Sequence, residues 1–124
     1  MIKVELPKPN VVITQREQVL KEGEVEIPSI YGFIDFHQLP RDVGGIFMFY
    51  NKENELLFVG KARKIRQRIK KHFEDNSSEM INHRNEVYKI SVCIVAEALD
   101  RDIYESYAIN TLRSKYNIDK AFFR

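Results

Sequence analysis

The chain from Gly45 to Phe73 reads GIFMFYNKENELLFVGKARKIRQRIKKHF. Two short apolar runs, at 46–50 and 56–59, flank a polar segment, which is the pattern of two antiparallel strands joined by a turn. Neither run alternates with polar residues, so we expect both faces of this hairpin to be covered. After Gly60 the apolar residues recur every three or four positions, which predicts a helix beginning near residue 61.

The predicted helix is strongly basic. Seven Lys or Arg residues and no acidic residue lie between positions 61 and 71: Lys61, Arg63, Lys64, Arg66, Arg68, Lys70 and Lys71. The formal net charge of the whole chain is only +2, because the remaining 13 basic residues face 18 acidic ones. Such a concentration of positive charge beside a glycine-containing strand end indicates a binding site for a polyanion.

Two polar side chains lie at the edge of the apolar face of this helix. Ile65 and Ile69 form the middle of that face, and Arg68 and His72, four residues apart, lie beside them. This placement would let Arg68 and His72 line a site next to the helix. The alternative is that Arg68 extends its charged end into solvent and His72 packs against the core.

A second helix is predicted over residues 99–116, and it carries one acidic residue on its apolar face. The apolar positions of that face are Ala98, Ala108, Ile109, Leu112 and Tyr116. Glu105 falls in the centre of the same stripe, where a carboxylate is costly unless it is paired, hydrogen-bonded or bound to a metal. Arg101, one turn earlier, is one candidate partner for Glu105, and a divalent metal ion is the other.

The rest of the chain suggests one small α+β domain. Residues 87–95 alternate in polarity and predict a half-exposed third strand. We therefore expect a three-stranded antiparallel sheet flanked by helices over residues 41–124. Residues 1–40 would form an N-terminal extension packed on this core. Within it we expect a short helix over 15–21, because Thr14-Gln-Arg-Glu matches a capping box.

Composition narrows the function classes. At 124 residues, with 44% hydrophobic and 31% charged residues, the chain suits one soluble domain. It contains no apolar run near the ~20 residues of a membrane span and no signal-peptide core at Met1, so we expect a cytoplasmic protein without a membrane partner. The single cysteine, Cys93, stands in an apolar run, and three scattered histidines do not form a zinc motif.

Three blocks of the sequence together resemble the GIY-YIG nuclease family, and within it the N-terminal incision domain of UvrC-type excinucleases. The first block is Gly45-Ile46-Phe47, and the second is Phe58-Val59-Gly60-Lys61-Ala62-Arg63. The third joins Glu105 to Asn117 twelve residues later, in the ending Lys-Tyr-Asn-Ile. The likeness extends over about residues 43–118. The chain departs from the family pattern at both tyrosines, which are Phe47 and Phe58 here.

The resemblance implies a metal-dependent cleavage of DNA phosphodiester bonds, of the kind used in nucleotide excision repair. It implies that Glu105 binds Mg²⁺ or Mn²⁺ and that Arg68 stabilises charge in the transition state. The residues expected to hold the DNA backbone are Lys61, Arg63, Lys64, Arg66, Lys70 and Lys71, with Asn117 closing the site. Asn117 also suits the end of a helix, whichever function is right.

The missing tyrosine hydroxyls leave the activity open. Loss of a general base costs ~10²–10⁴-fold in rate, and we expect His72 to act as a substitute base. Restoring a hydroxyl at Phe47 or Phe58 should cost little stability if a metal site lies beside the rings. Two alternatives remain, which are a nucleic-acid-binding module without hydrolysis and an interaction protein of a repair complex.

Overall fold

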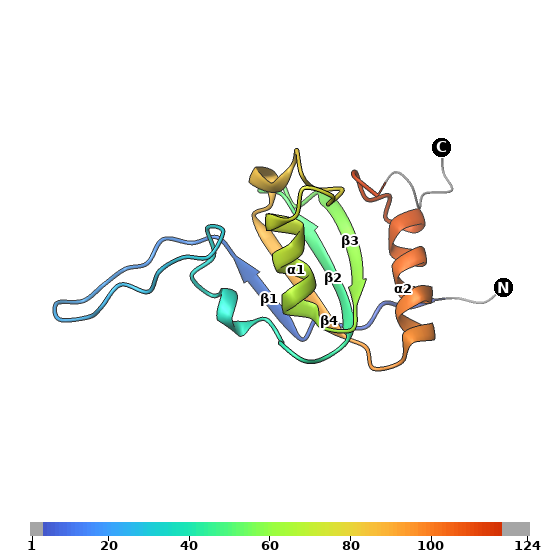
Figure 1. The fold of residues 1–124 in the computed structure, drawn as a ribbon, viewed down its shortest axis with the longest axis horizontal. Helices are drawn as coiled ribbons and strands as arrows, with labels where there is room; N and C mark the ends of the chain where they lie inside the picture. The colour runs from blue at the N-terminus through green and yellow to red at the C-terminus, as the bar shows by residue number, and fades with distance from the viewer. Residues whose placement is uncertain (1–3, 118–124) are drawn as a thin grey trace.

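A computed structural model describes residues 4–117 of the chain. It contains one antiparallel sheet in the strand order β1-β4-β2-β3, with two α-helices (Figure 1). The elements in chain order are β1 (Val11–Thr14), the 3-10 turn η1 (Phe36–Gln38), β2 (Gly45–Tyr50), β3 (Leu56–Ala62), α1 (Ile65–Glu74), the 3-10 turn η2 (Arg84–Glu86), β4 (Lys89–Ile94) and α2 (Ala98–Thr111). The expected α+β class and the basic helix are confirmed.

The sheet has four strands rather than the expected three. The additional strand is β1, which pairs with the outer edge of β4 through Val11 opposite Val92 and Ile13 opposite Ile90. Ile13 is buried in the same apolar cluster as the helix α1. The sequence around Val11 is strand-like, but its partner lies more than 70 residues away, so no local pattern predicts the pairing.

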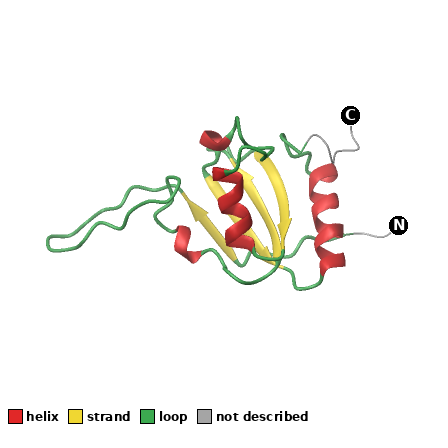
Figure 2. Ribbon diagram, viewed as in Figure 1, coloured by secondary structure: helices red, strands yellow, loops and turns green. Residues whose placement is uncertain are grey.

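Helix α1 covers one face of the sheet, and helix α2 lies on the other side (Figures 1 and 2). The central strand β2 is therefore buried on both faces, as its apolar run predicts. The expectation of a half-exposed strand β4 is wrong, because the four residues from Ile90 to Cys93 are all buried. Ser91 and Cys93 alternate with Ile90 and Val92 and therefore point to the opposite face of the sheet. Both are buried, so that face is covered as well.

The predicted helix over residues 15–21 is absent. Residues 15–30 instead form a long projecting loop without regular structure (Figures 1 and 2). The Gln18 side-chain amide pairs with both backbone groups of Ile27 at 3.1 Å, and Gly23, with φ of +86°, allows the turn between the two arms. A capping box forms a stable helix only where an apolar face can pack, and Val19 is 89% exposed.

Residues 31–40 return from this loop to the core. Phe33, Phe36 and Leu39 are buried in the apolar cluster that also contains Ile65 of α1. Tyr31 stacks on Phe73 at a centroid distance of 4.7 Å. The aromatic side chains of this segment therefore contribute to packing next to α1.

In the part of the chain that the structure describes, no helix is long and apolar enough to cross a membrane.

Candidate functional site

Strand β3 directs its side chains alternately to the two helices. Phe58 packs in the cluster under α1, and Gly60 lies directly beneath the Phe47 ring, where a Cβ atom would stand 2.2 Å from Phe47 Cζ. Val59 and Lys61 point to the opposite face, toward α2. The expected helix start at residue 61 is therefore wrong, because Lys61 is a strand residue and its side chain is directed away from α1.

Lys61 bridges two carboxylates of helix α2. Its ammonium donates a hydrogen bond to Asp102 Oδ1 and lies 3.8 Å from Glu105 Oε1. The Glu105 side chain is only 7% exposed, whereas that of Asp102 is 57% exposed. The hydrogen bond to Asp102 is the main cause of a raised pKa at Lys61, with Glu105 adding to it, so the lysine remains charged at neutral pH.

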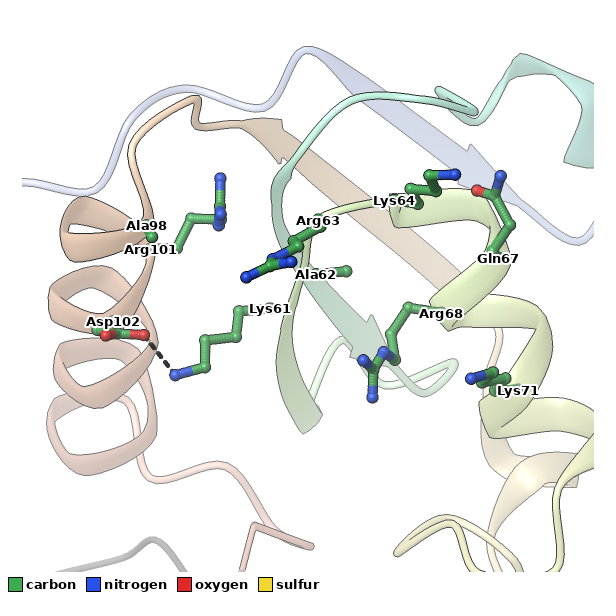
Figure 3. Close-up of a pocket in the computed structure, with 10 residues that line it drawn as sticks. All are labelled: Lys61, Ala62, Arg63, Lys64, Gln67, Arg68, Lys71, Ala98, Arg101 and Asp102. Carbon is green, nitrogen blue, oxygen red and sulfur yellow. Dashed lines mark hydrogen bonds and ion pairs between the residues drawn. The ribbon is translucent and has the colours of Figure 1, made fainter.

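A pocket of about 490 Å³ lies beside this bridge, between α1 and the start of α2 (Figure 3). It is lined by Lys61, Ala62, Arg63, Lys64, Gln67, Arg68, Lys71, Ala98, Arg101 and Asp102. Six of these ten residues are cationic and only Asp102 is anionic. The tertiary structure thus brings five of the predicted phosphate-binding or catalytic residues together around one open space, which strongly favours an anionic ligand.

Arg101 is a pocket residue that the sequence did not identify as one. Its Nη1 donates to the carbonyl oxygens of Val95 and Ala96 at 2.9 and 2.8 Å, and its guanidinium packs against Gly44. The Lys61 ammonium, from strand β3, lies within 4 Å of the Glu105 carboxylate. A helical i, i+4 spacing made Arg101 the obvious partner for Glu105, but the carbonyl groups before α2 engage its guanidinium.

Phe47, Phe58 and His72 lie together on the α1 face and do not line the pocket. Their rings form one cluster, in which His72 is 4.8 Å from Phe58 and 5.5 Å from Phe47 between centroids. His72 Nδ1 also lies 2.8 Å from Ser78 Oγ. Phe47 is fully buried and Phe58 is 4% exposed. His72 therefore packs against the two rings that replace the family tyrosines, and its hydrogen bond to Ser78 orients the imidazole.

Two of the predicted phosphate-binding residues lie outside the pocket. Arg66 donates from Nε to the carbonyl of Leu39 at 2.8 Å and from Nη2 to that of His37, so it anchors the returning segment to α1. The pKa of Arg66 is lower than its ordinary value, and the main cause is the loss of water around its guanidinium. Lys70 is exposed on α1 but does not line the pocket. Helical spacing gives the face of each residue, but not which backbone carbonyls lie beside it.

Asn117 is buried and is not placed to contact a nucleic acid. Its amide accepts from the Val59 N–H at 2.7 Å and donates to the Val59 carbonyl at 2.8 Å, and Ser114 donates to the same amide oxygen. Tyr116 N–H likewise bonds to the carbonyl of Leu57 at 2.8 Å. The segment after α2 therefore covers the outer edge of strand β3, which would otherwise expose unpaired backbone groups.

The donor set around Lys61 fits a magnesium-like ion. Mg²⁺ and Mn²⁺ prefer oxygen ligands, and Mg²⁺ commonly takes one or two carboxylates while its other ligands are water or substrate oxygens. Glu105 offers a nearly buried carboxylate of this kind, and the neighbouring Asp102 carboxylate accepts the hydrogen bond of the Lys61 ammonium. Among the described residues no group of three or more His, Cys, Asp or Glu could hold a metal.

Comparisons with known proteins agree with this fold. The protein-family model of the UvrC-like GIY-YIG domain matches residues 43–118 of this chain. The uncharacterized protein YurQ of Bacillus subtilis is 64% identical over 124 residues and is aligned over 100% of both chains. The UvrABC system protein C of Helicobacter acinonychis is 30% identical over 84 residues, which are 60% of this chain. That match covers only 14% of the Helicobacter protein.

Solved structures of the N-terminal GIY-YIG endonuclease domain of UvrC from Thermotoga maritima share the fold. The domain bound to magnesium has a TM-score of 0.59 and 21% identity, covering 67% of this chain and 96% of that chain. A point mutant of the same domain, with phenylalanine in place of a tyrosine, was solved bound to the catalytic divalent cation. It has a TM-score of 0.59 and 22% identity, covering 67% of this chain and 94% of that chain.

Proposed function

The chain belongs to the family of UvrC-like GIY-YIG domains, and we propose that it cleaves DNA phosphodiester bonds with the help of Mg²⁺ or Mn²⁺. One observation carries this proposal. The pocket is lined by six cationic side chains, and one of them, Lys61, lies 3.8 Å from the nearly buried Glu105 carboxylate, which does not itself line the pocket. A phosphate backbone supplies the anions that such a pocket would bind, and a buried carboxylate supplies a ligand for a divalent ion.

The charged residues divide three tasks of the proposed reaction among them. Arg63, Lys64 and Lys71 hold phosphates on either side of the scissile bond. Arg68, which extends into the pocket from α1 (Figure 3), stabilises the negative charge that develops on the phosphoryl oxygens. Glu105 holds the divalent ion, which when bound supplies Lewis-acid stabilisation and lowers the pKa of water.

His72 is the proposed proton acceptor in place of the absent tyrosine hydroxyls. Its ring lies against Phe58, at one of the two positions where the family pattern has tyrosine. His72 does not line the pocket, so in this role the proton would have to reach it by way of water. The Thermotoga domain with one tyrosine replaced by phenylalanine is described as bound to its catalytic cation, so metal binding there tolerates the loss of a hydroxyl.

A second candidate function is a DNA-binding module without hydrolysis. The observation in its favour is that both Phe47 and Phe58 lack the hydroxyl and are buried in an apolar cluster. The pocket cations would bind phosphates equally well in this case. A place in excision repair is proposed for either function, because the matched UvrC proteins belong to the UvrABC system.

A cleavage assay separates the two functions. Supercoiled, nicked, flapped and damaged DNA are incubated with the protein in Mg²⁺, in Mn²⁺ and in EDTA. We expect metal-dependent nicking that falls at least 100-fold in Glu105→Ala and Arg68→Ala, and changes less than about twofold in Lys70→Ala, whose position is exposed but outside the pocket. DNA binding without cleavage in any metal would favour the binding module. Absence of binding at low salt would contradict both functions.

A further inference from the structure

Two carboxylates of α2 share the single ammonium of Lys61, and they differ in their surroundings. Asp102 receives the hydrogen bond and is more than half exposed, whereas Glu105 lies 3.8 Å from the ammonium and is nearly buried. Figure 3 shows the Lys61 side chain extending from β3 toward Asp102 of α2. In this arrangement the lysine is bonded to the outer carboxylate and remains close to the inner one.

The position of this ammonium controls what the inner carboxylate can bind. A divalent ion sits about 2.0–2.1 Å from a carboxylate oxygen, so an ammonium bonded directly to Glu105 would compete for the same lone pairs and repel the ion. Lys61 is held by its strand close to α2, and its ammonium lies within 4 Å of both carboxylates. Asp102 accepts its hydrogen bond one helical turn closer to the start of α2.

We infer that Asp102 is a positioning residue that holds the Lys61 ammonium off Glu105 and thereby keeps the Glu105 carboxylate available for a divalent cation. This inference rests on the proposed function, because it concerns the same metal site. The family resemblance concerns Glu105, Arg68 and the strand lysine, and Asp102 forms no part of it. In this chain Asp102 therefore sets how strongly Lys61 competes with the metal.

The same helix offers a matched control. Asp100 carries the same charge two residues earlier and is also exposed, but at 100° per residue it points about 200° away from Asp102. Asp100→Asn and Asp102→Asn thus remove one negative charge each from the first turns of α2. A difference between them reports the contact with Lys61 rather than the overall charge of the helix.

The test is a double-mutant cycle on Mn²⁺ affinity, measured by titration calorimetry and by the metal-induced rise in unfolding temperature. We expect Asp102→Asn to weaken Mn²⁺ binding at least fivefold, because Lys61 then moves onto Glu105. In the Lys61→Met background the same substitution should change affinity by less than about twofold. Asp102→Glu should restore binding, Asp100→Asn should leave it within about twofold, and Glu105→Gln should abolish it.

Three results would overturn the inference. If Asp102→Asn weakens binding equally with and without Lys61, then Asp102 acts as a direct ligand or through its charge alone. If it has no effect in either background, Lys61 does not compete for Glu105. In both cases metal binding by the wild-type protein leaves the proposed function intact. If the wild-type protein binds no Mn²⁺ with or without DNA, the metal-dependent function fails and the inference fails with it.

Discussion

The two faces of strand β3 differ in chemistry although they alternate along one short segment. The face toward α1 is aromatic, with Phe58 and Gly60 under the rings of Phe47 and His72. The face toward α2 ends in charge, with Lys61 between Asp102 and Glu105. Both departures from the family pattern lie on the aromatic face, and the retained lysine and glutamate lie on the charged one.

Aromatic packing and charged interactions thus lie on opposite faces of strand β3. Exchanging a tyrosine for phenylalanine on the aromatic face removes a polar atom from a cluster that consists mainly of aromatic rings. The charged face keeps its groups because they are partly solvated and bonded to one another. Substitutions on the two faces should therefore change different measurable quantities.

The largest expected effect is a loss of stability on the aromatic face alone. Phe47→Ala should lower the free energy of unfolding by about 3–5 kcal/mol, because a fully buried ring leaves a cavity between β2 and α1. Lys61→Met, on the charged face, should change it by less than about 1 kcal/mol. Urea unfolding of both variants measures the contrast. Equal losses would show that the ion bridge is as structural as the aromatic cluster.

Restoring the tyrosines should have unequal costs. The Phe47 ring is fully buried against Gly60, so a hydroxyl there is expected to cost about 1–3 kcal/mol, which revises the sequence-based expectation of little cost. Phe58 lies against the His72 imidazole, a polar partner, so Phe58→Tyr should cost less. We expect Phe58→Tyr to raise metal-dependent nicking at least tenfold, with DNA affinity within about twofold. No gain in a fully folded variant would indicate that His72 already serves the reaction.

DNA affinity should distinguish the pocket from the rest of α1. Lys71→Glu should weaken binding roughly tenfold, whereas Lys70→Glu, outside the pocket, should weaken it about threefold or less. With four or five phosphate contacts, log K should fall against log[salt] with a slope of roughly −4. Fluorescence anisotropy over a salt series measures both quantities. Equal effects of the two reversals would mean that the whole helix, rather than the pocket, binds the backbone.

The smallest expected effect concerns the contact of Tyr116 with His83 and Glu86. Tyr116, just after α2, stacks on His83 at 3.6 Å and donates to the Glu86 carboxylate at 2.9 Å. The Tyr116 hydroxyl is the main cause that lowers the pKa of Glu86, with His83 contributing. A lowered folded-state pKa stabilises the protein above about pH 4.3, the ordinary value for glutamate, and this stabilisation disappears as the pH falls through the folded value.

Thermal unfolding between pH 7 and pH 3 tests the contribution of this contact to stability. The wild type should lose stability below about pH 4, and Glu86→Gln should remove one part of that loss, worth less than about 1 kcal/mol because the pair is partly solvated. An unchanged pH profile in Glu86→Gln would show that other carboxylates account for the acid sensitivity. Loss of the contact between Tyr116 and Glu86 should leave the Mn²⁺ affinity at Glu105 unchanged.

Local patterns in the sequence predicted much of this molecule. The hairpin of β2 and β3, the basic helix and the buried position of Glu105 all follow from the spacing of apolar residues, because burial imposes a period on each element. The family resemblance rests on residues at fixed separations, which a linear sequence displays fully. These features required no knowledge of what each element packs against.

Tertiary contacts decided the features that depend on partners distant in sequence. Strand β1 needed the edge of β4, and the projecting loop replaced a predicted helix because no apolar surface was there to pack it. Arg66 was engaged by the carbonyls of another segment, and Asn117 by the edge of β3. Strand β3 continues through Lys61 and Ala62, the first two positions expected of the helix, which turns Lys61 toward α2 and places its charge beside Glu105. A shift of one residue in a strand reverses the face of every side chain, so this placement follows from the pairing of β3 with β2 and not from composition.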